Sequence, residues 1–598
     1  MIFSPQCLPA ACQVVDAGLA FGHEFVIGFT KKIDLKINPQ SMKVSFLLLV
    51  MLLASGFVFG QSINLAPNPG FEQGTRSWVN RTATIDKSVR HSGNASLKYV
   101  NNDPKNYRVI LTHINVKGGE TLRFSTWVKG QDIKPAAFGK KGAGIYLHAY
   151  DENDKSLGGS NPPTPSGTFD WTQVEGLFEL PADTRKIAIS LYLVQGNTGT
   201  AWFDDIVVEN VSLDQIVEVR SSLGTAADST KPFTKDAPAK AMSSNGVFLD
   251  HEGFTVKNGE RIFPFGIYIG KAERQGIWKQ EDLHLNRIKD AGFNAVLSYI
   301  HGDNKDASLY LDKLDKLGLH SIFSLSYLYD GHQFYSPING QRASKRVAEI
   351  VGNLKEKPAL LSWYTGDEIE LSHLIASREN YDVIKSIDNK HPIFQVTNRL
   401  DMVPKLMWAA DIVGTDPYPI GKLLPPNLKQ VREWTSATVK TTEQKKGVWQ
   451  VVQIFNKVAF QKELSDDYLD PTAGQIQNML FQSVIQGAKG ILFYAYHPLW
   501  YGINSEGKAD FSEEIYNRRW KEVAAVSRRF SDIIPVILAN DVTTVSNIVA
   551  DEGVIFKAWR YGAETYLMVA NTLDSVASVV VPGHTIELEA QGSRWVKL

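Results

Sequence analysis

Strand-like and helix-like segments alternate eight times between residues 246 and 533, and this rhythm limits the fold more than any other feature. Each strand-like run is short, apolar and rich in β-branched or aromatic residues, and helical apolar spacing follows several of them. The runs are 262–268, 292–300, 320–326, 359–368, 393–397, 412–418, 448–453 and 490–496. Eight such alternations predict one closed (β/α)8 barrel over residues 246–533.

Different patterns flank the barrel segment. Residues 61–212 contain short runs with period-two alternation, such as 122–128 and 187–193, separated by Gly, Pro and Asn, which predicts a β-sandwich. Residues 213–245 are rich in Ser, Ala, Lys, Asp and Pro and predict a linker. Residues 534–598 return to strand patterns. The predicted fold class is multidomain: a β-sandwich of jelly-roll type, a (β/α)8 TIM barrel and a small C-terminal β-sandwich.

The N-terminal region has the pattern of a secretory signal peptide over residues 42–60. Met42 and Lys43 precede the apolar run 46–54, and small residues follow as far as Gly60. The run is short for a membrane span, which favours a cleaved signal peptide over the alternative, a retained membrane anchor. We expect no stable membrane insertion after cleavage. The pattern predicts a protein that is secreted, periplasmic or held at the cell surface.

A signal peptide stands at the start of a chain, so residues 1–41 are interpreted as a mis-annotated extension before the true initiator. Both cysteines, Cys7 and Cys12, lie in that extension. The mature chain would then rely on packing rather than on disulfides. The formal net charge of −1 gives no electrostatic reason to expect a nucleic-acid partner.

The fourth strand-like run ends in two adjacent carboxyl groups, Asp367 and Glu368, directly after Trp363 and Tyr364. A (β/α)8 barrel carries its catalytic groups at the C-terminal ends of its strands. Burial beside aromatic rings raises a carboxyl pKa, which is what a proton donor for sugar cleavage needs. Glu368 is therefore the predicted general acid. The alternative is an acid that only stabilises the N-terminus of the helix predicted over 371–379.

This segment resembles the large clan of barrel glycoside hydrolases that carry an acid/base Glu after strand four, and the run 287–294 is similar to the clan's first helix and second strand. The clan has Asn-Glu where this chain has Asp-Glu. The resemblance implies a nucleophilic Glu at the end of strand seven, but Gln450 and Gln453 stand there. Three interpretations remain. The second carboxylate is Asp416, or it is Asp367, or the barrel is catalytically inactive.

Other polar and aromatic residues near strand ends are predicted to contact substrate. Aromatic residues form 11% of the chain, with 13 Trp and 21 Tyr, and such rings suit carbohydrate stacking. The predicted substrate-binding residues are Tyr268, His301, Trp363, Asn398, Tyr418, Gln453, Tyr496, His497 and Trp500.

The sandwich segment resembles carbohydrate-binding modules of the cellulose- and xylan-binding jelly-roll type, through the runs 64–72 and 201–206. The resemblance implies a structural calcium ion held by Glu72 and Asp205, although both acids also suit solvated turns. The predicted ligand contacts are three residues that alternate along one strand face, Tyr146, His148 and Tyr150. Two tryptophans, Trp127 and Trp202, are expected in the core.

Together these patterns predict an exported glycoside hydrolase that acts on a polysaccharide or oligosaccharide and needs no cofactor for catalysis. Two rival hypotheses stay open. One is a non-catalytic glycan-binding protein whose barrel has lost its nucleophile. The other is a polysaccharide lyase or transglycosylase that uses His301 and tyrosines as base and acid.

Overall fold

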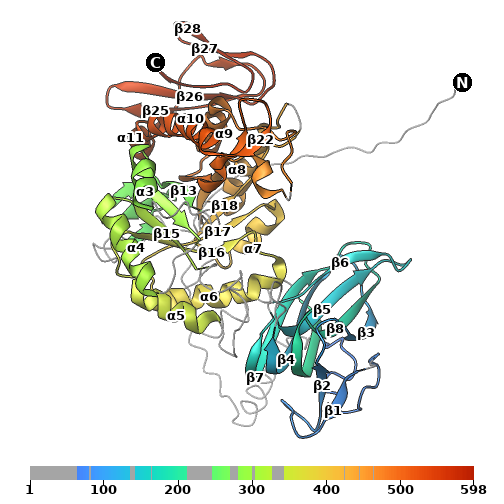
Figure 1. Ribbon diagram of the computed structural model, residues 1–598. Coiled ribbons are helices and arrows are strands. Elements are labelled where there is room, and N and C mark those ends of the chain that lie inside the picture. The colour runs from blue at the N-terminus through green and yellow to red at the C-terminus, as the bar shows by residue number, and fades with distance from the viewer. Residues whose placement is uncertain are drawn as a thin grey trace, which may run out of the picture. The chain divides into compact units, whose positions relative to one another are not determined.

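The computed structural model describes residues 63–79, 82–134, 142–162, 164–211, 246–269, 281–299, 304–325, 343–422, 425–443, 445–461 and 463–598 (Figure 1). The predicted extension, signal peptide and linker therefore lie outside the described residues. Among those that are described, no helix is both long and apolar enough to cross a membrane.

The N-terminal part is built from two antiparallel sheets, with strand orders β1-β2-β9-β4-β7 and β3-β8-β5-β6. The strands are β1 Thr84–Asp86, β2 Ser96–Asn101, β3 Val109–Asn115, β4 Thr121–Lys134, β5 Ala143–Tyr150, β6 Ser156–Ser160, β7 Gly167–Glu179, β8 Lys186–Leu193 and β9 Thr198–Asn210. Alternate residues of each strand face a shared core that includes Phe124 from β4 and Leu191 from β8, both fully buried. Period-two alternation thus produces the layers that the sequence predicts.

A small antiparallel sheet, β10 (Val247–Leu249), β11 (Thr255–Lys257) and β12 (Glu260–Ile262), leads into the barrel. Eight parallel strands then pair in chain order, and the first pairs with the last, so the prediction of one closed eight-stranded barrel is confirmed. These strands are β13 Phe265–Ile269, β14 Ala295–Ser298, β15 His320–Ser324, β16 Leu360–Asp367, β17 Ile393–Thr397, β18 Ile412–Thr415, β19 Gly447–Gln453 and β20 Gly490–Tyr494.

Helical segments connect the barrel strands and follow the last of them. They are α3 Glu281–Asp290, α4 Asn304–Leu317, α5 Ala343–Leu354, η3 Leu371–His373, α6 Leu374–Ile387, η4 Leu400–Met402, α7 Val403–Leu406, α8 Lys429–Thr442, η5 Lys457–Phe460, α9 Ala473–Ile485, η6 His497–Trp500, α10 Glu513–Ser531 and α11 Ile534–Ala539. A short hairpin, β21 Tyr501–Ile503 and β22 Ala509–Phe511, precedes α10. Helix α9 starts with a reciprocal capping box between Thr472 and Gln475, which satisfies two otherwise unpaired backbone donors.

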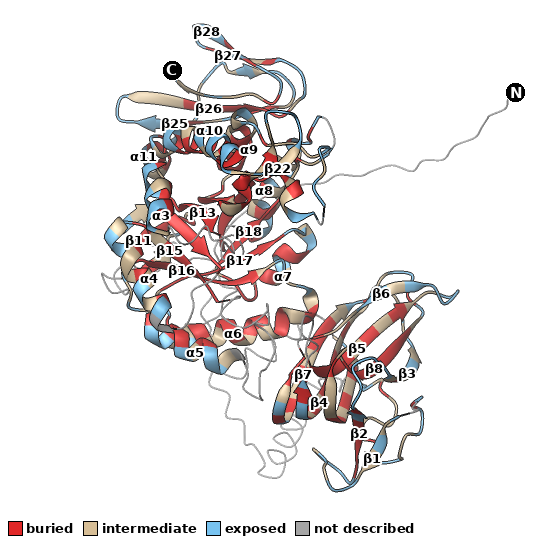
Figure 2. Ribbon diagram, viewed as in Figure 1, coloured by how far each residue is buried: buried red, intermediate tan, exposed pale blue. Residues whose placement is uncertain are grey.

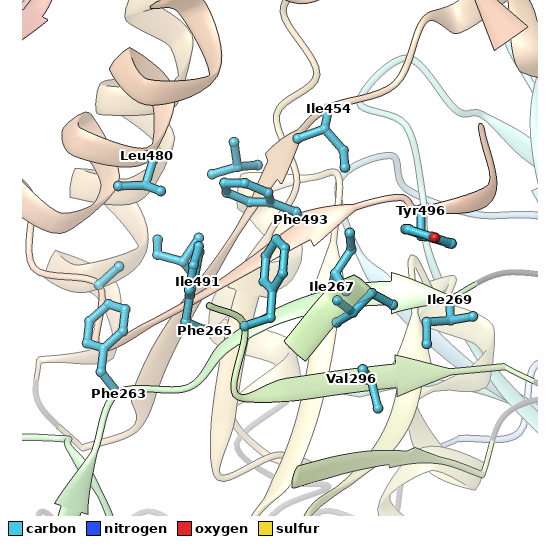
Figure 3. Close-up of a cluster of buried hydrophobic side chains, with 14 of the residues drawn as sticks. Phe263, Phe265, Ile267, Ile269, Val296, Ile454, Leu480, Ile491, Phe493 and Tyr496 are labelled. Atoms are coloured by element: carbon cyan, nitrogen blue, oxygen red, sulfur yellow. The ribbon is translucent and has the colours of Figure 1, made fainter. Parts of the chain in front are cut away.

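The barrel strands are buried on both faces (Figure 2). One set of side chains fills the barrel interior, as Leu297, Phe394 and Trp449 do. The other set packs between strands and helices, as Phe265 and Phe493 do (Figure 3). Burial on both faces explains why these strands are continuous apolar runs in the sequence.

The C-terminal residues form two further antiparallel sheets, β23-β25-β26-β29 and β24-β27-β28. Their strands are β23 Val542–Thr543, β24 Val549–Ala550, β25 Val554–Tyr561, β26 Glu564–Asn571, β27 Ala577–Val581, β28 His584–Leu588 and β29 Ser593–Lys597. Asn478 of α9 donates hydrogen bonds to the carbonyl oxygens of Asn571 (3.0 Å) and Gly592 (2.9 Å). These sheets therefore contact the helix that lies between β19 and β20.

Candidate active site at the C-terminal ends of the barrel strands

Two carboxyl groups from different strands meet at the C-terminal edge of the barrel. Glu368 follows β16, and Asp416 follows β18. The two side chains lie within hydrogen-bonding reach of each other, and the Tyr418 hydroxyl also bonds to Asp416. Parallel strands place their C-terminal ends at the same edge of a barrel, so residues 48 positions apart in the chain share one site.

Glu368 stands on an unusual backbone turn. Its φ of 51° lies in the left-handed region, which residues with a Cβ atom rarely adopt. A register shift between Tyr364 and Gly366 precedes the turn, and the Glu368 amide donates to the carbonyl oxygen of Val396 at 2.9 Å. Backbone strain of this kind clusters at functional sites.

The two acids have different surroundings. Asp416 is only 4% exposed, whereas the Glu368 side chain reaches solvent. Burial raises the pKa of Asp416 well above its usual range, and the nearby charge of Glu368 acts in the same direction. The protein around Glu368 also raises the pKa of that group, chiefly through desolvation. The pair can therefore keep a proton at a pH where an isolated carboxyl group is ionised.

The third carboxyl group, Asp367, is held by a tyrosine. The Tyr299 hydroxyl, just after β14, donates to Asp367 Oδ2 at 3.0 Å. The charge of Asp367 raises the pKa of Glu368 and of Asp416 further. Asp367 therefore favours the protonated forms of its two neighbours.

Five tyrosines line this end of the barrel. Their ring centroids lie 5.1 to 6.3 Å from one another along the contacts Tyr268–Tyr299, Tyr268–Tyr364, Tyr268–Tyr494, Tyr299–Tyr364 and Tyr418–Tyr494. Burial raises the pKa of Tyr268, Tyr364 and Tyr418 well above the usual value. These phenols stay neutral at ordinary pH, and they surround the carboxyl groups with hydroxyl groups and apolar ring surface.

The side chain of Gln453, the last residue of β19, forms hydrogen bonds with backbone groups. Its side-chain oxygen accepts from the Ile420 amide at 2.9 Å, and its side-chain nitrogen donates to the carbonyl oxygens of Ile420 (2.8 Å) and Phe455 (3.1 Å). The residue is fully buried. The two bonds to Ile420 hold the segment that follows Asp416, and the bond to Phe455 holds the segment that follows β19. Gln453 therefore supports two loops rather than facing a substrate.

Three aromatic residues predicted to contact substrate belong to the core instead. Trp363 is fully buried against the helices, and its indole donates to Asp388 Oδ2 at 2.7 Å. Tyr496 lies among the side chains between strands and helices (Figure 3), where its hydroxyl contacts His284 Nδ1 at 2.8 Å. Trp500 stacks on Tyr516 with ring centroids 3.8 Å apart. The correction has one cause: each side chain leaves its strand or loop on the helix side.

The remaining predicted residues are placed as follows. Tyr268 and Tyr418 belong to the tyrosine cluster, while Asn398 is exposed just after β17. His497 is half-buried at the start of η6, and burial lowers its pKa to about 4, so its imidazole is neutral at ordinary pH. His301 lies outside the described residues.

The sequence predictions missed two aromatic residues that contact the groups described above, Tyr299 and Phe460. Tyr299 follows a strand directly, so the strand-end rule used for Tyr268 would have found it. Phe460 ends the 3-10 helix η5, beyond β19, and its ring centroid lies 6.2 Å from that of Tyr494. No local pattern links a residue in such a loop to the barrel mouth.

The N-terminal sheets hold a separate groove of about 460 Å³. Tyr146, His148 and Tyr150 line it together, as their alternation along one strand predicts. His148 stacks on Tyr150 with centroids 4.6 Å apart and lies edge-on to Tyr146 at 5.5 Å. The groove thus offers flat rings with polar edges, which is the surface that a sugar ring needs.

The two predicted calcium ligands are already paired with protein donors. Glu72 accepts from the Asn94 amide at 2.7 Å, and Asp205 contacts His91 Nδ1 at 2.7 Å and accepts from the Ser92 hydroxyl at 2.7 Å. Within the described ranges, no three or more His, Cys, Asp or Glu side chains are grouped so that they could hold a metal ion. The calcium ion at Glu72 and Asp205 therefore stays a prediction.

Both tryptophans expected in the sandwich core can also be placed. Trp202 is buried and donates to Asp86 Oδ2 at 2.9 Å. Trp127 is only half-buried and stacks on His91, with ring centroids 3.9 Å apart. Trp127 therefore lies on the outer face of its sheet, because its β4 neighbours Thr126 and Val128 are the buried ones.

Residues 64–198 match a family model described as a carbohydrate binding domain. This match covers strands β1 to β8 of the two N-terminal sheets, and it includes the strand that carries Tyr146, His148 and Tyr150. The chain thus contains a segment similar to carbohydrate-binding domains, and its groove lies within that segment.

Comparison with solved structures gives only weak likenesses. One is to bacteriophage CBA120 tailspike protein 4, with 11% identity and a TM-score of 0.21; this match covers 25% of the present chain and 22% of that chain. A glycoside hydrolase shares 12% identity over 60% of this chain and 94% of its own, with a TM-score of 0.39. A glycoside hydrolase family 5 protein from Bacteroides vulgatus shares 12% identity over 59% and 90%, also at 0.39. TM-scores of this size carry no argument about chemistry.

Proposed function

We propose that this protein is an exported glycoside hydrolase that cleaves glycosidic bonds of a polysaccharide or oligosaccharide at the mouth of its barrel. The observation that carries the proposal is the pair formed by Glu368 and Asp416, two carboxyl groups with raised pKa values at the C-terminal ends of β16 and β18. Glycoside hydrolysis needs two carboxyl groups, one as acid and one as base or nucleophile. The similarity of residues 64–198 to carbohydrate-binding domains supports a glycan as the ligand.

In the proposed reaction Glu368, the more accessible acid, donates its proton to the glycosidic oxygen while the bond to the anomeric carbon breaks. Water supplies the new hydroxyl group on that carbon, and its proton returns to a carboxylate. Asp416 is the second carboxyl group. Retaining enzymes hold their two carboxyl groups roughly 5–5.5 Å apart, and inverting enzymes hold them roughly 6.5–9.5 Å apart. Glu368 is the exposed member of the pair, so its side chain is the one that would set this separation when a sugar enters.

The groove between Tyr146 and Tyr150 would hold the glycan while the barrel cuts it. Ring stacking and hydrogen bonds from neutral side chains such as His148 suit an uncharged sugar chain. Export through the signal peptide predicted at residues 42–60 would bring the protein to polymers outside the cytoplasm.

A second candidate function is glycan binding without cleavage, and the specific observation in its favour is Gln453. This residue occupies the strand-seven position where the resemblance to barrel glycosidases implies a nucleophilic Glu, and its amide is committed to backbone groups. A binding protein would keep the groove and the tyrosines while leaving the polymer intact.

Product analysis with a panel of neutral and acidic polysaccharides tests the proposed function. Hydrolysis is expected to release saturated fragments with new reducing ends. Unsaturated fragments that absorb in the ultraviolet would instead identify a lyase. Pull-down of a polymer without any fragment would favour the binding protein.

A further inference from the structure

Four aromatic rings form a continuous surface from the acid pair to solvent; we call Tyr418, Phe455, Phe460 and Tyr494 the aromatic ledge. Tyr494 packs against Tyr418 with centroids 5.6 Å apart and against Phe455 at 5.5 Å. Phe460 contacts Phe455 at 5.1 Å and Tyr494 at 6.2 Å. The ledge therefore joins residues that follow strands β18 and β19 to the last residue of β20.

The inner end of the ledge touches the catalytic pair. Tyr418 bonds to Asp416, and the charges of Asp367, Glu368 and Asp416 all raise the pKa of Tyr494. Phe460 is one ring further out. A sugar bound at the acids would thus have its neighbouring sugar near Phe460, since one pyranose ring and one aromatic ring are similar in size.

Phe460 is also the exposed member of the ledge. It is 52% exposed, whereas Phe455 behind it is 3% exposed. Single exposed apolar residues are common on proteins and need no function by themselves. Phe460 differs because the plane of its ring lies at only 26° to the plane of the Tyr494 ring, so the two rings present nearly parallel faces. Both rings belong to the ledge that begins at the carboxyl groups.

We propose that Phe460 binds a second sugar of the substrate by ring stacking, next to the sugar whose bond is cleaved. The inference rests on the proposed function only in that Glu368 and Asp416 mark the point of cleavage. Phe460 has an apolar side chain without hydrogen-bonding groups, so this subsite favours an uncharged sugar with an apolar face. It makes a disaccharide or a longer oligosaccharide a better ligand than a monosaccharide.

The test uses the full-length chain with the groove disabled, so that it measures oligosaccharide binding at the barrel only. Tyr146→Ala with His148→Ala removes the stacking surface of the groove, and Glu368→Gln prevents turnover. In this background, calorimetry with cellohexaose, xylohexaose and mannohexaose is compared with and without Phe460→Leu, which keeps bulk but loses the flat ring. Phe460→Trp is the conservative variant, and Phe556→Ala, which removes a 40% exposed phenylalanine of β25, is the matched control.

Phe460→Leu is expected to weaken hexasaccharide binding about tenfold, while Phe460→Trp and Phe556→Ala leave it within about twofold. Equal affinity in Phe460→Leu, or no barrel-dependent binding of any of the three sugars, would overturn the inference. Thermal melting checks that the variants fold. If the wild-type chain cleaves nothing but Phe460→Leu still weakens binding, the proposed hydrolysis fails while the subsite stands.

Discussion

The barrel mouth and the groove of the N-terminal sheets use the same aromatic chemistry but differ in their charged groups. Tyrosines line both. The barrel mouth adds Asp367, Glu368 and Asp416, whereas the described residues that line the groove include no carboxyl group. Rings bind a sugar, but only a group that exchanges protons near the working pH can cleave one. Under the proposed function, binding and cleavage would therefore use separate surfaces, and each should be removable without the other.

The largest expected effect comes from Glu368→Gln. Loss of the proton donor should lower kcat about a thousandfold, because general acid catalysis contributes roughly two to four orders of magnitude. Glycan binding at the groove should not change. Glu370→Gln, which alters a carboxyl group that is 70% exposed only two residues away, is the matched control and should keep activity. Steady-state kinetics checks both. Near-normal turnover in Glu368→Gln would remove Glu368 from the mechanism.

Gln453→Glu separates the chemical role of strand seven from its structural one. A carboxylate cannot donate to the carbonyl oxygens of Ile420 and Phe455, so the free energy of unfolding should fall by about 1–3 kcal/mol. Activity should not rise. Urea unfolding measures the change, with Gln461→Glu at an exposed position as control. A variant that stays stable and turns over substrate faster would contradict the structural role of Gln453. It would show that wild type lacks a nucleophile at this position.

Tyr146→Ala breaks the groove alone. Loss of one stacking ring should weaken polysaccharide binding about tenfold, with little change in the hydrolysis of short soluble oligosaccharides. Affinity electrophoresis measures the first quantity and kinetics the second. Tyr561→Ala, which removes a tyrosine of β25 that is 46% exposed, controls for the general loss of an aromatic ring. Equal losses in binding and in turnover of short substrates would contradict the division between the two surfaces.

The smallest expected effect is the change in stability caused by Asp416→Asn, and its size depends on pH. The pKa of Asp416 is raised in the folded state, so the folded protein binds the Asp416 proton more tightly than the unfolded chain does. The stability of wild type therefore falls as the pH rises above the pKa of the unfolded chain. Asn has no such proton. The variant should therefore gain about 1 kcal/mol relative to wild type between pH 4 and pH 8, measured by urea unfolding. A relative loss over that range would contradict the raised pKa.

The barrel was predictable because its strands are buried on both faces. Every predicted run overlaps one barrel strand, from 262–268 to 490–496, since continuous apolar runs are the signature of such strands. The meeting of Glu368 with Asp416 was predictable for a related reason. Both follow strands of one parallel barrel, so topology alone brings them to the same edge.

The side on which an aromatic residue leaves its strand was not predictable. Trp363 and Tyr364 are adjacent, yet one packs against the helices and the other faces the barrel interior. The choice depends on register, and β16 carries register shifts against both of its neighbours. Loop contacts were equally hidden, because the bonds of Gln453 to Ile420 span 33 residues and Phe460 approaches Tyr494 from outside any strand.

The most direct test of the central claim is the incubation of a neutral oligosaccharide panel with the wild-type chain and with Glu368→Gln in ¹⁸O-labelled water. Mass spectrometry then follows the products. Hydrolysis at the barrel mouth predicts one ¹⁸O atom at each newly formed reducing end with wild type, and almost none with Glu368→Gln. Intact sugars with both proteins, or cleavage that persists in Glu368→Gln, would contradict the assignment of glycoside hydrolysis to the Glu368–Asp416 pair.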